Sequence, residues 1–344
     1  MATGRKQEEA TATGWSREEV LHHIELLAAE FLKCLSDGKV LNLEALKRSS
    51  SAMIYDRKKQ QQFHGNETRL IRLNRQGGRR YTGIWLILQT VHALLTENKT
   101  ATQRDVYYLH PFFKGQSEAD EAILDTGSIL GVPRGCMNIV GATKGFFTGN
   151  ISILRDGQWR HFSSGEEVSI TQELLQLKPS EIEDKFFETI PSILITGRGF
   201  PDLATRMFVS LLSRVFELPV FGLCDCNPFG LSIMLTYKLG SARMPLESLQ
   251  YAVDIKWVGF RPSQAARLGL PSSSLKALTR KDIAVADSLL RTSFVQANGA
   301  YKEEVEMWLG DSLPWKIELE ALHFLGFTFL TSFLQDCIKK GNFL

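Results

Sequence analysis

The sequence has few cysteines, no long hydrophobic run and almost no net charge, and each scarcity excludes a class of protein. Its five cysteines are odd in number and scattered, which argues against a disulfide framework and predicts a reducing compartment inside the cell. No run approaches the roughly 18 apolar residues that a membrane-spanning helix needs, so we expect no membrane association. The amino-terminal residues also lack the apolar segment of a secretory signal.

The charge is nearly balanced, with 40 Lys and Arg against 38 Asp and Glu, which excludes a uniformly basic nucleic-acid-binding protein. One segment departs from this balance: residues 57–80 hold eight basic side chains and a single acid, Glu67. Such a run is either a solvated segment or a surface for a polyanion, and both interpretations stay open. The candidate nucleic-acid-binding residues from this segment are Arg57, Lys58, Lys59, Arg79 and Arg80.

Helical patterns dominate the first part of the chain. Ser16 with Glu19 predicts a capping box, and an apolar seam follows that packs either against its own domain or on a partner helix. Apolar periodicity predicts a second helix over residues 84–95. Thr102 with Asp105 predicts the start of a third helix.

A further helix is expected from a cap at Ser117 with Asp120, ending near Gly131. Two β-rich runs, residues 137–142 and 146–154, then predict a hairpin joined around Lys144. Short helices followed by a hairpin are typical of a winged-helix domain, which binds DNA through one helix in the major groove.

The second half of the chain has a different pattern. Residues 192–196 and 219–224 predict buried strands, each followed by a helix, which is a parallel α/β arrangement. Asp225 and Asn227 follow the second strand, and their oxygens could hold Mg²⁺, which prefers oxygen ligands. The alternative is that they only cap the helix that Pro228 begins.

Tyr107 and Tyr108 lie on the short helix after Arg104. A tyrosyl hydroxyl can attack phosphorus and form a covalent intermediate where nearby charge stabilises the reaction. Arg104 precedes Tyr108 by four residues, so both share a helical face. Without context, paired tyrosines on an amphipathic helix are also ordinary core residues.

Five segments in order carry a specific resemblance: ATQRDVYYLHP, GVPRGCMNIVGATKGFFTGNI, SILITGRGFPDLATR, FGLCDCNPFGLSIMLTYKLGS and KWVGFRPS. Together they resemble the meiotic double-strand-break proteins of the sporulation-eleven family and the topoisomerase VI A-type proteins, over roughly residues 80–340. The resemblance implies a mixed α/β fold with a winged-helix domain, which bears the nucleophile, and a Toprim-like domain, which binds Mg²⁺. We therefore expect an amino-terminal tail and partner-binding helix in residues 1–50, the winged-helix domain in 51–155 and the Toprim-like domain in 156–344.

The same resemblance implies roles for individual residues. Tyr108 is the expected nucleophile, Tyr107 its non-essential neighbour and Arg104 an assistant at the phosphate, while Lys144 falls in the wing. The implied activity is cleavage of double-stranded DNA through a 5′-phosphotyrosyl intermediate, in a homodimer or heterodimer of A-type subunits. A topoisomerase VI B-like ATPase partner, a type II ATP-hydrolysing complex and a nuclear location in meiotic recombination are implied with it.

The chain also departs from the family pattern at the metal site. About twenty residues that would carry the first strand and its metal-binding glutamate are missing before residue 183, and neither Glu181 nor Glu183 can be assumed to replace that ligand. Asp225-Cys226-Asn227 stands where the family has Asp-x-Asp, so Asp225 and Asn227 are the predicted metal ligands. The alternative function is therefore a catalytically impaired DNA- or partner-binding paralogue or shortened isoform with an incomplete metal site.

Overall fold

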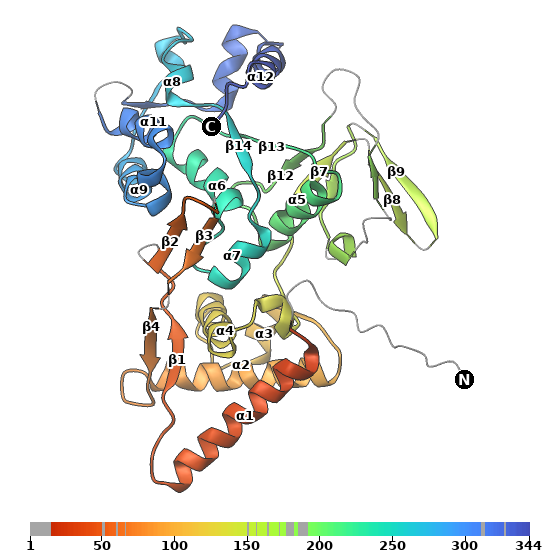
Figure 1. Cartoon of the computed structure of the whole chain (residues 1–344), viewed down its shortest axis with the longest axis vertical. Coiled ribbons are helices and arrows are strands. Elements are labelled where there is room, and N and C mark those ends of the chain that lie inside the picture. The colour runs from red at the N-terminus through yellow and green to blue at the C-terminus, as the bar shows by residue number, and fades with distance from the viewer. Residues whose placement is uncertain are drawn as a thin grey trace. The chain divides into compact units, whose positions relative to one another are not determined.

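The computed structural model describes residues 15–49, 52–59, 61–65, 67–149, 151–155, 157–163, 165–171, 173–176, 182–184, 192–310, 314–326 and 328–344 (Figure 1). The chain divides into two compact units. Unit 1 comprises residues 1–52, 64–142 and 242–250, and unit 2 comprises residues 53–63, 143–241 and 251–344.

The elements of unit 1 are mainly helical. They are α1 (Arg17–Ser36), β1 (Leu43–Leu46), β4 (Thr68–Ile71), α2 (Gly78–Thr96), β5 (Ala101–Thr102), α3 (Gln103–Leu109), α4 (Gln116–Leu130), the 3-10 helix η2 (Arg134–Met137), β6 (Ile139–Val140) and α7 (Pro245–Tyr251), whose last residue belongs to unit 2.

Unit 2 contains both strands and helices. They are β2 (Met53–Asp56), β3 (Gln61–His64, whose last residue belongs to unit 1), β7 (Phe146–Thr148), β8 (Ile151–Arg155), β9 (Gln158–Phe162), β10 (Val168–Ser169), η3 (Glu173–Gln176), β11 (Ile182–Asp184), β12 (Leu194–Thr196), α5 (Leu203–Val215), β13 (Val220–Leu223), α6 (Pro228–Leu239), β14 (Ile255–Gly259), α8 (Pro262–Ala265), η5 (Ser272–Ser274), β15 (Lys276–Ala277), α9 (Arg280–Leu290), α10 (Ser293–Ala297), α11 (Gly299–Leu309), β16 (Trp315–Lys316), η6 (Leu319–Leu325) and α12 (Phe329–Lys339).

Unit 1 has one hydrophobic core between its helices. α1 begins at the predicted capping box of Ser16 and Glu19, and it buries Val20 and Ile24. α2 buries one apolar face, including Ile84 and Val91, which confirms the predicted periodicity. α4 contacts both α2 and α3, so the helix that carries the two tyrosines lies on a packed support.

The helix cap predicted from the sequence is confirmed at α3 but not at α4. Thr102 and Asp105 form the predicted reciprocal capping box. α4 begins after Gly115 without a side-chain cap, so the predicted cap by Ser117 and Asp120 is wrong; Asp120 instead accepts a hydrogen bond from Gln103. α4 does end at Gly131, whose φ of +71° is the left-handed conformation that favours glycine.

The predicted hairpin between residues 137–142 and 146–154 is wrong. β6 pairs in parallel with β5, whereas β7 pairs with β10 and β12, and β8 pairs with β9 and β11. The reason lies in burial, because Phe147 of β7 is 1% exposed and packs against Phe208 with ring centroids 5.0 Å apart. The second run therefore belongs to the core of unit 2, and the first to unit 1.

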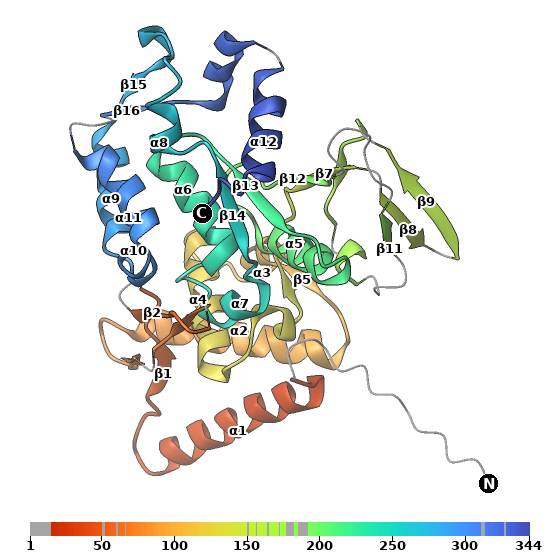
Figure 2. The ribbon, with the colours of Figure 1, turned by 45° about the horizontal axis from the view of Figure 1, so that its top comes forward.

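The centre of unit 2 is a parallel pair of strands, β13 and β14, which confirms the α/β class of this half. α6 spans the predicted residues and packs against β14 and α9. Trp257 of β14 is fully buried and stacks on Tyr301 of α11 at 5.8 Å. α9 and α11 lie side by side in Figures 1 and 2, and the carboxyl terminus lies at β14, where the backbones of Leu344 and Trp257 exchange hydrogen bonds of 2.7 and 3.2 Å.

The first strand of this half differs from its prediction. β12 pairs antiparallel with β7 rather than in parallel with β13. Leu194 is 61% exposed, whereas its neighbour Ile195 packs against the core. β12 is therefore covered on one face only, and one covered face suits an antiparallel strand.

The unit boundaries differ from the domain ranges expected from the sequence. The hairpin of β2 and β3 packs in unit 2, where Tyr55 contacts Phe294 edge-on at 5.0 Å and Ser293 donates a hydrogen bond to the Met53 carbonyl at 3.3 Å. Residues 143–155 also pack in unit 2, because the β7 and β8 side chains complete its core.

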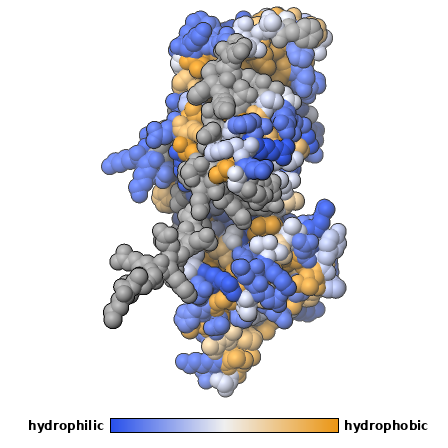
Figure 3. Space-filling view, turned by 90° about the vertical axis from the view of Figure 1, so that its right-hand side faces the viewer, coloured by the Kyte–Doolittle hydropathy of each residue, from blue (hydrophilic) through white to orange (hydrophobic). Residues whose placement is uncertain are grey.

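Surface hydrophobicity is scattered. On the face in Figure 3, hydrophobic and hydrophilic side chains are interspersed. Large exposed hydrophobic residues include Leu32 on α1 and Phe324 in η6, which are 65% and 67% exposed. Among the described helices none is long and apolar enough to cross a membrane alone; only η6 and α12 together pass by length and composition, and they meet at 102°.

Candidate nucleophile on helix α3 and candidate metal ligands after β13

The two tyrosines of helix α3 differ in their exposure to solvent. Tyr108 is 70% exposed, while Tyr107 is half-buried against the unit 1 core, and their ring centroids are 5.2 Å apart. Val106 is 1% exposed and fixes the inner face of the helix. Tyr108 therefore presents its hydroxyl to solvent, whereas Tyr107 serves the packing of the helix.

Arg104 occupies the same outer face of α3. It is exposed, and within the described part of the chain nothing bonds to its guanidinium group or to the Tyr108 hydroxyl. The spacing of four residues puts both side chains one turn apart on a helix. A cation one helical turn from a phenol is an arrangement that suits a phosphate-directed nucleophile.

The start of α3 is held firmly. The Thr102 backbone N–H donates to Asp105 at 2.8 Å, and this bond with that from the Thr102 hydroxyl lowers the pKa of Asp105. Gln103 donates to Asp120 on α4 at 2.8 Å and accepts from Arg134 at 2.6 Å. The helix that carries Tyr108 is therefore tied to α4 and η2 through side chains.

Two of the predicted DNA-binding residues are engaged by carboxylates of α4. Arg79 donates to both oxygens of Glu118, at 2.5 and 2.9 Å, and to the Phe112 carbonyl. Arg80 contacts Asp125 at 2.5 Å. Both positive charges are thus compensated within unit 1, which the sequence alone did not indicate.

Asp125 is the centre of this ion-pair network. It is fully buried and contacts Arg48, Arg69 and Arg80 at 2.5–2.6 Å. No prediction from the sequence included this residue; the available signal was its place seven residues after Glu118 on one helix face.

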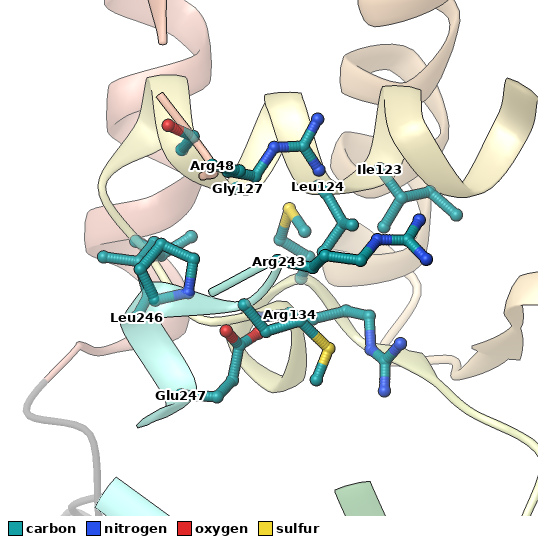
Figure 4. A pocket seen from close by; sticks show the side chains of 13 residues that line it. Arg48, Ile123, Leu124, Gly127, Arg134, Arg243, Leu246 and Glu247 are labelled. Atoms are coloured by element: carbon teal, nitrogen blue, oxygen red, sulfur yellow. The ribbon is translucent and has the colours of Figure 1, made fainter. Parts of the chain in front are cut away.

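A pocket of unit 1 lies beside the network (Figure 4). In that view the side chains of Arg48, Arg134 and Arg243 extend in the same direction, and Leu246 lies at the opposite side. Glu121 pairs with Arg48 and Arg243 at 2.7 and 2.6 Å, and Glu247 accepts from the Arg134 backbone N–H at 3.0 Å. Glu121 therefore compensates Arg48 and Arg243, whereas the Arg134 guanidinium donates to the neutral amide of Gln103.

The remaining predicted basic residues lie in unit 2. Arg57, Lys58 and Lys59 form the exposed turn of the β2–β3 hairpin, and Asp56 accepts from the backbone N–H groups of Lys58 and Lys59 at 2.8 and 3.3 Å. Lys144 is exposed, and its backbone N–H donates to Asp202 at 2.6 Å. Lys144 therefore does not lie in a hairpin with residues 137–142, so the predicted wing is wrong at this residue.

The predicted metal ligands lie on the loop between β13 and α6. Asp225 accepts a hydrogen bond from the Leu319 backbone N–H at 2.9 Å. Asn227 is the N-cap of α6 and accepts from the Gly230 N–H at 2.7 Å. The capping alternative therefore describes Asn227, whose single side-chain oxygen already accepts a hydrogen bond, as does one of the two oxygens of Asp225.

These residues do not by themselves fit a divalent metal ion. Among the described residues no group of three or more His, Cys, Asp or Glu side chains comes together as a metal site. Glu181 lies outside the described residues, and Glu183 is on β11, where only its backbone pairing with Ser152 is described. One carboxylate and one amide offer too few oxygens and too little charge.

Comparison with known proteins identifies both halves of the chain. A family model for type IIB DNA topoisomerases matches residues 79–139, and a model for the Toprim domain of Spo11 and the topoisomerase 6 A proteins matches residues 180–338. The meiotic recombination protein SPO11 of Homo sapiens is 32% identical over 293 residues, covering 78% of this chain and 74% of the human protein. The chain belongs to the Spo11/topoisomerase 6 A family.

Other relatives extend the comparison. The meiotic recombination protein SPO11 of Mus musculus is 29% identical over 356 residues, covering 96% of this chain and 89% of the mouse protein. The A-type DNA topoisomerase 6 protein of Arabidopsis thaliana is 29% identical over 267 residues, covering 71% of this chain and 62% of that protein. The Spo11/topoisomerase 6 A family consists of DNA-cleaving transesterases, and the Toprim domain is a fold that binds divalent metals.

Proposed function

We propose that this chain is a DNA-cleaving transesterase that makes double-strand breaks in meiotic recombination, with Tyr108 as its nucleophile. The supporting observation is that Tyr108 is the exposed tyrosine of α3, on one face with Arg104, inside the segment that matches type IIB topoisomerases. The relatives named meiotic recombination proteins support the biological setting.

The proposed chemistry exchanges one phosphodiester for another. The Tyr108 oxygen forms a bond to phosphorus, the bond from phosphorus to the 3′ oxygen breaks, and the proton lost by the phenol is balanced by protonation of the leaving 3′ hydroxyl. The 5′ side of the break stays attached to Tyr108 as a phosphotyrosyl ester. Arg104 stabilises the negative charge that develops on the phosphoryl oxygens.

The proposed metal is Mg²⁺, with Asp225 and Asn227 as its ligands from this chain. Because these two residues form an incomplete set, we route no step of the reaction through the metal. The alignment with mouse SPO11 is longer than this whole chain, so the mouse protein has residues that this chain lacks within the matched region. This supports the proposal that a segment bearing a further carboxylate is missing.

The proposed partners follow from the family. We propose double-stranded DNA as the substrate, a second A-type subunit, identical or related, for the other strand, and a topoisomerase VI B-like ATPase partner that makes the complex ATP-hydrolysing. The proposed location is the nucleus, where meiotic DNA is broken.

The test is a pair of matched tyrosine variants. Tyr108→Phe is expected to abolish the covalent protein–DNA adduct, because it removes the attacking oxygen and leaves no cavity. Tyr107→Phe is expected to retain most of the adduct, because Tyr107 contributes packing. The adducts are counted by denaturing gel after incubation with labelled duplex DNA, and an adduct that persists in Tyr108→Phe would overturn the assignment.

A further inference from the structure

Helix α3 ends at a histidine that is bonded to another helix. His110 is the C-cap of α3, and its Nε2 lies 2.6 Å from the Oγ1 of Thr90 on α2. Thr90 is 6% exposed, so water does not replace this contact easily. The bond therefore ties the end of the helix that bears Tyr108 to the core of unit 1.

The direction of this hydrogen bond follows from the other bond of Thr90. The Thr90 hydroxyl donates to the Leu86 carbonyl of its own helix at 3.0 Å. A hydroxyl has only one hydrogen, and with that hydrogen on the Leu86 bond Thr90 accepts from His110, which assigns the ring proton to Nε2. Burial lowers the pKa of His110 below its ordinary value of 6.5, which favours the neutral ring with this single N–H.

The residues after Tyr108 fold back around this histidine. The Phe113 ring contacts the His110 ring edge-on at 6.1 Å, and the Phe113 backbone N–H donates to the His110 carbonyl at 3.1 Å. Leu109, between Tyr108 and His110, is 62% exposed and holds nothing in place. His110 is thus the nearest anchor on the carboxyl side of Tyr108.

The end of α3 needs such an anchor. A helix of seven residues is too short to be stable by itself, and its last carbonyl groups lack partners within the helix. The start of α3 has its capping box, whereas the C-cap at His110 has an extended backbone and no capping N–H. The bond to Thr90 therefore adds a side-chain tie to the last turn, which carries Tyr108.

We propose that His110 is a positioning residue for Tyr108, acting through its Nε2–H···Oγ1 bond to Thr90. The bond fixes the last turn of α3, and so it fixes the direction in which the Tyr108 oxygen approaches a phosphodiester. The inference rests on the proposed role of Tyr108 as the nucleophile. In-line attack depends steeply on geometry, and a displacement of about 1 Å can cost on the order of a hundredfold in rate.

Four variants of the full chain test the bond. Thr90→Val removes the acceptor, and His110→Ala removes the donor. His110→Gln places an amide N–H at the position of Nε2, whereas His110→Asn, the matched control, places its amide at the position of Nδ1. The rate of adduct formation on nicked duplex DNA is measured with the DNA dissociation constant of each variant.

We expect Thr90→Val, His110→Ala and His110→Asn to slow adduct formation about tenfold to a hundredfold without changing the DNA dissociation constant. The double variant Thr90→Val/His110→Ala should lose no more than either single variant, because both remove the same bond. His110→Gln should restore most of the rate. Additive losses, or equal rates in His110→Gln and His110→Asn, would overturn the proposal.

A second readout does not depend on cleavage. With 3-fluorotyrosine in place of Tyr108, the ¹⁹F spectrum should show one narrow line in the otherwise unaltered chain and in His110→Gln. The line should broaden or split in His110→Ala and Thr90→Val. If the unaltered chain forms no adduct, the proposed function fails while this spectrum still decides the role of His110, and an unchanged line in all variants would refute it.

Discussion

At the scale of single residues, a buried acid determines what the neighbouring arginines can do. Asp125 contacts three guanidinium groups, so removing its buried carboxylate leaves the buried Arg48 with only the partly exposed Glu121 and removes the ion pairs of Arg69 and Arg80. We predict that Asp125→Ala lowers the free energy of unfolding by about 3–5 kcal/mol. Urea denaturation measures this, with Glu67→Ala as the control, since the exposed pair of Glu67 with Lys47 contributes about 0–1 kcal/mol. Equal effects would contradict the central role of Asp125.

The loop that carries the two proposed metal ligands, Asp225 and Asn227, gives a second prediction at this scale. Asp225 is the one full charge among the two proposed ligands, and Asn227 already caps α6. Because each absent carboxylate weakens Mg²⁺ binding, and about 1.4 kcal/mol corresponds to tenfold in affinity, we predict poor metal-dependent cleavage by this chain. Asn227→Asp alone should recover little. Calorimetric titration with Mg²⁺ and adduct yield against Mg²⁺ concentration check this.

The decisive experiment compares the unaltered chain with a variant to which the missing segment has been added. Asn227→Asp combined with insertion of the absent strand and its glutamate is expected to restore metal-dependent cleavage, because two carboxylates are then returned. Robust cleavage by the unaltered chain at low millimolar Mg²⁺ would instead show that other carboxylates have taken over.

At the scale of elements, a glycine sets how closely β7 approaches α5. Gly145 directly precedes β7, and a Cβ atom there would lie 2.0 Å from the Thr205 Oγ1 on α5. Thr205 is fully buried and bonded to Asp202, so it cannot move aside. We predict that Gly145→Ala lowers the free energy of unfolding by about 1–3 kcal/mol. Chemical denaturation measures this, and Gly135→Ala, whose Cβ would meet nothing within 4 Å, should be close to neutral.

A second substitution, which removes the clashing oxygen atom, tests the same contact. Thr205→Ala in the Gly145→Ala background should recover part of the lost stability by removing the clashing oxygen, although it loses the bond to Asp202. If Gly145→Ala were as harmless as Gly135→Ala, the close approach of β7 to α5 would be incorrect.

At the scale of the whole molecule, the small net charge of +2 hides a basic segment, residues 57–80. We predict that duplex binding is mainly electrostatic and independent of sequence, with roughly 4–6 phosphates neutralised and a log–log salt slope of about −4 to −5. Fluorescence anisotropy across a salt series measures it. A slope near zero would refute the prediction.

The variants for this measurement compare the cations of the exposed β2–β3 turn with an arginine that a carboxylate engages. Replacing Arg57, Lys58 and Lys59 by Ala should make the slope shallower by about 2–3, since three cations at an exposed turn are lost. Arg79→Ala should change it less, because Glu118 already engages Arg79. An equal change would mean that this ion pair opens on DNA.

Several features were determined by the sequence itself, because their interactions span only a few residues. The capping boxes at Ser16 and Thr102 join residues three apart, and the start of α6 at Pro228 follows from local backbone restriction. The face shared by Arg104 and Tyr108 is equally local, since four residues make about one helical turn. The family motifs of the α/β fold lie in continuous segments, so they too were readable in the sequence.

Only the tertiary structure decided the features that depend on distant partners. Arg80 contacts Asp125, which is 45 residues away in the sequence, and His110 contacts Thr90, which is 20 residues away. No local pattern therefore shows that the charge of Arg80 is compensated or that the side chain of His110 is anchored. The predicted hairpin is wrong for β7 because strand propensity is local, whereas burial of Phe147 in a core assembled from distant segments selects its partners β10 and β12. Local propensity specifies the element; the energy of burial and charge pairing among distant residues specifies its neighbours.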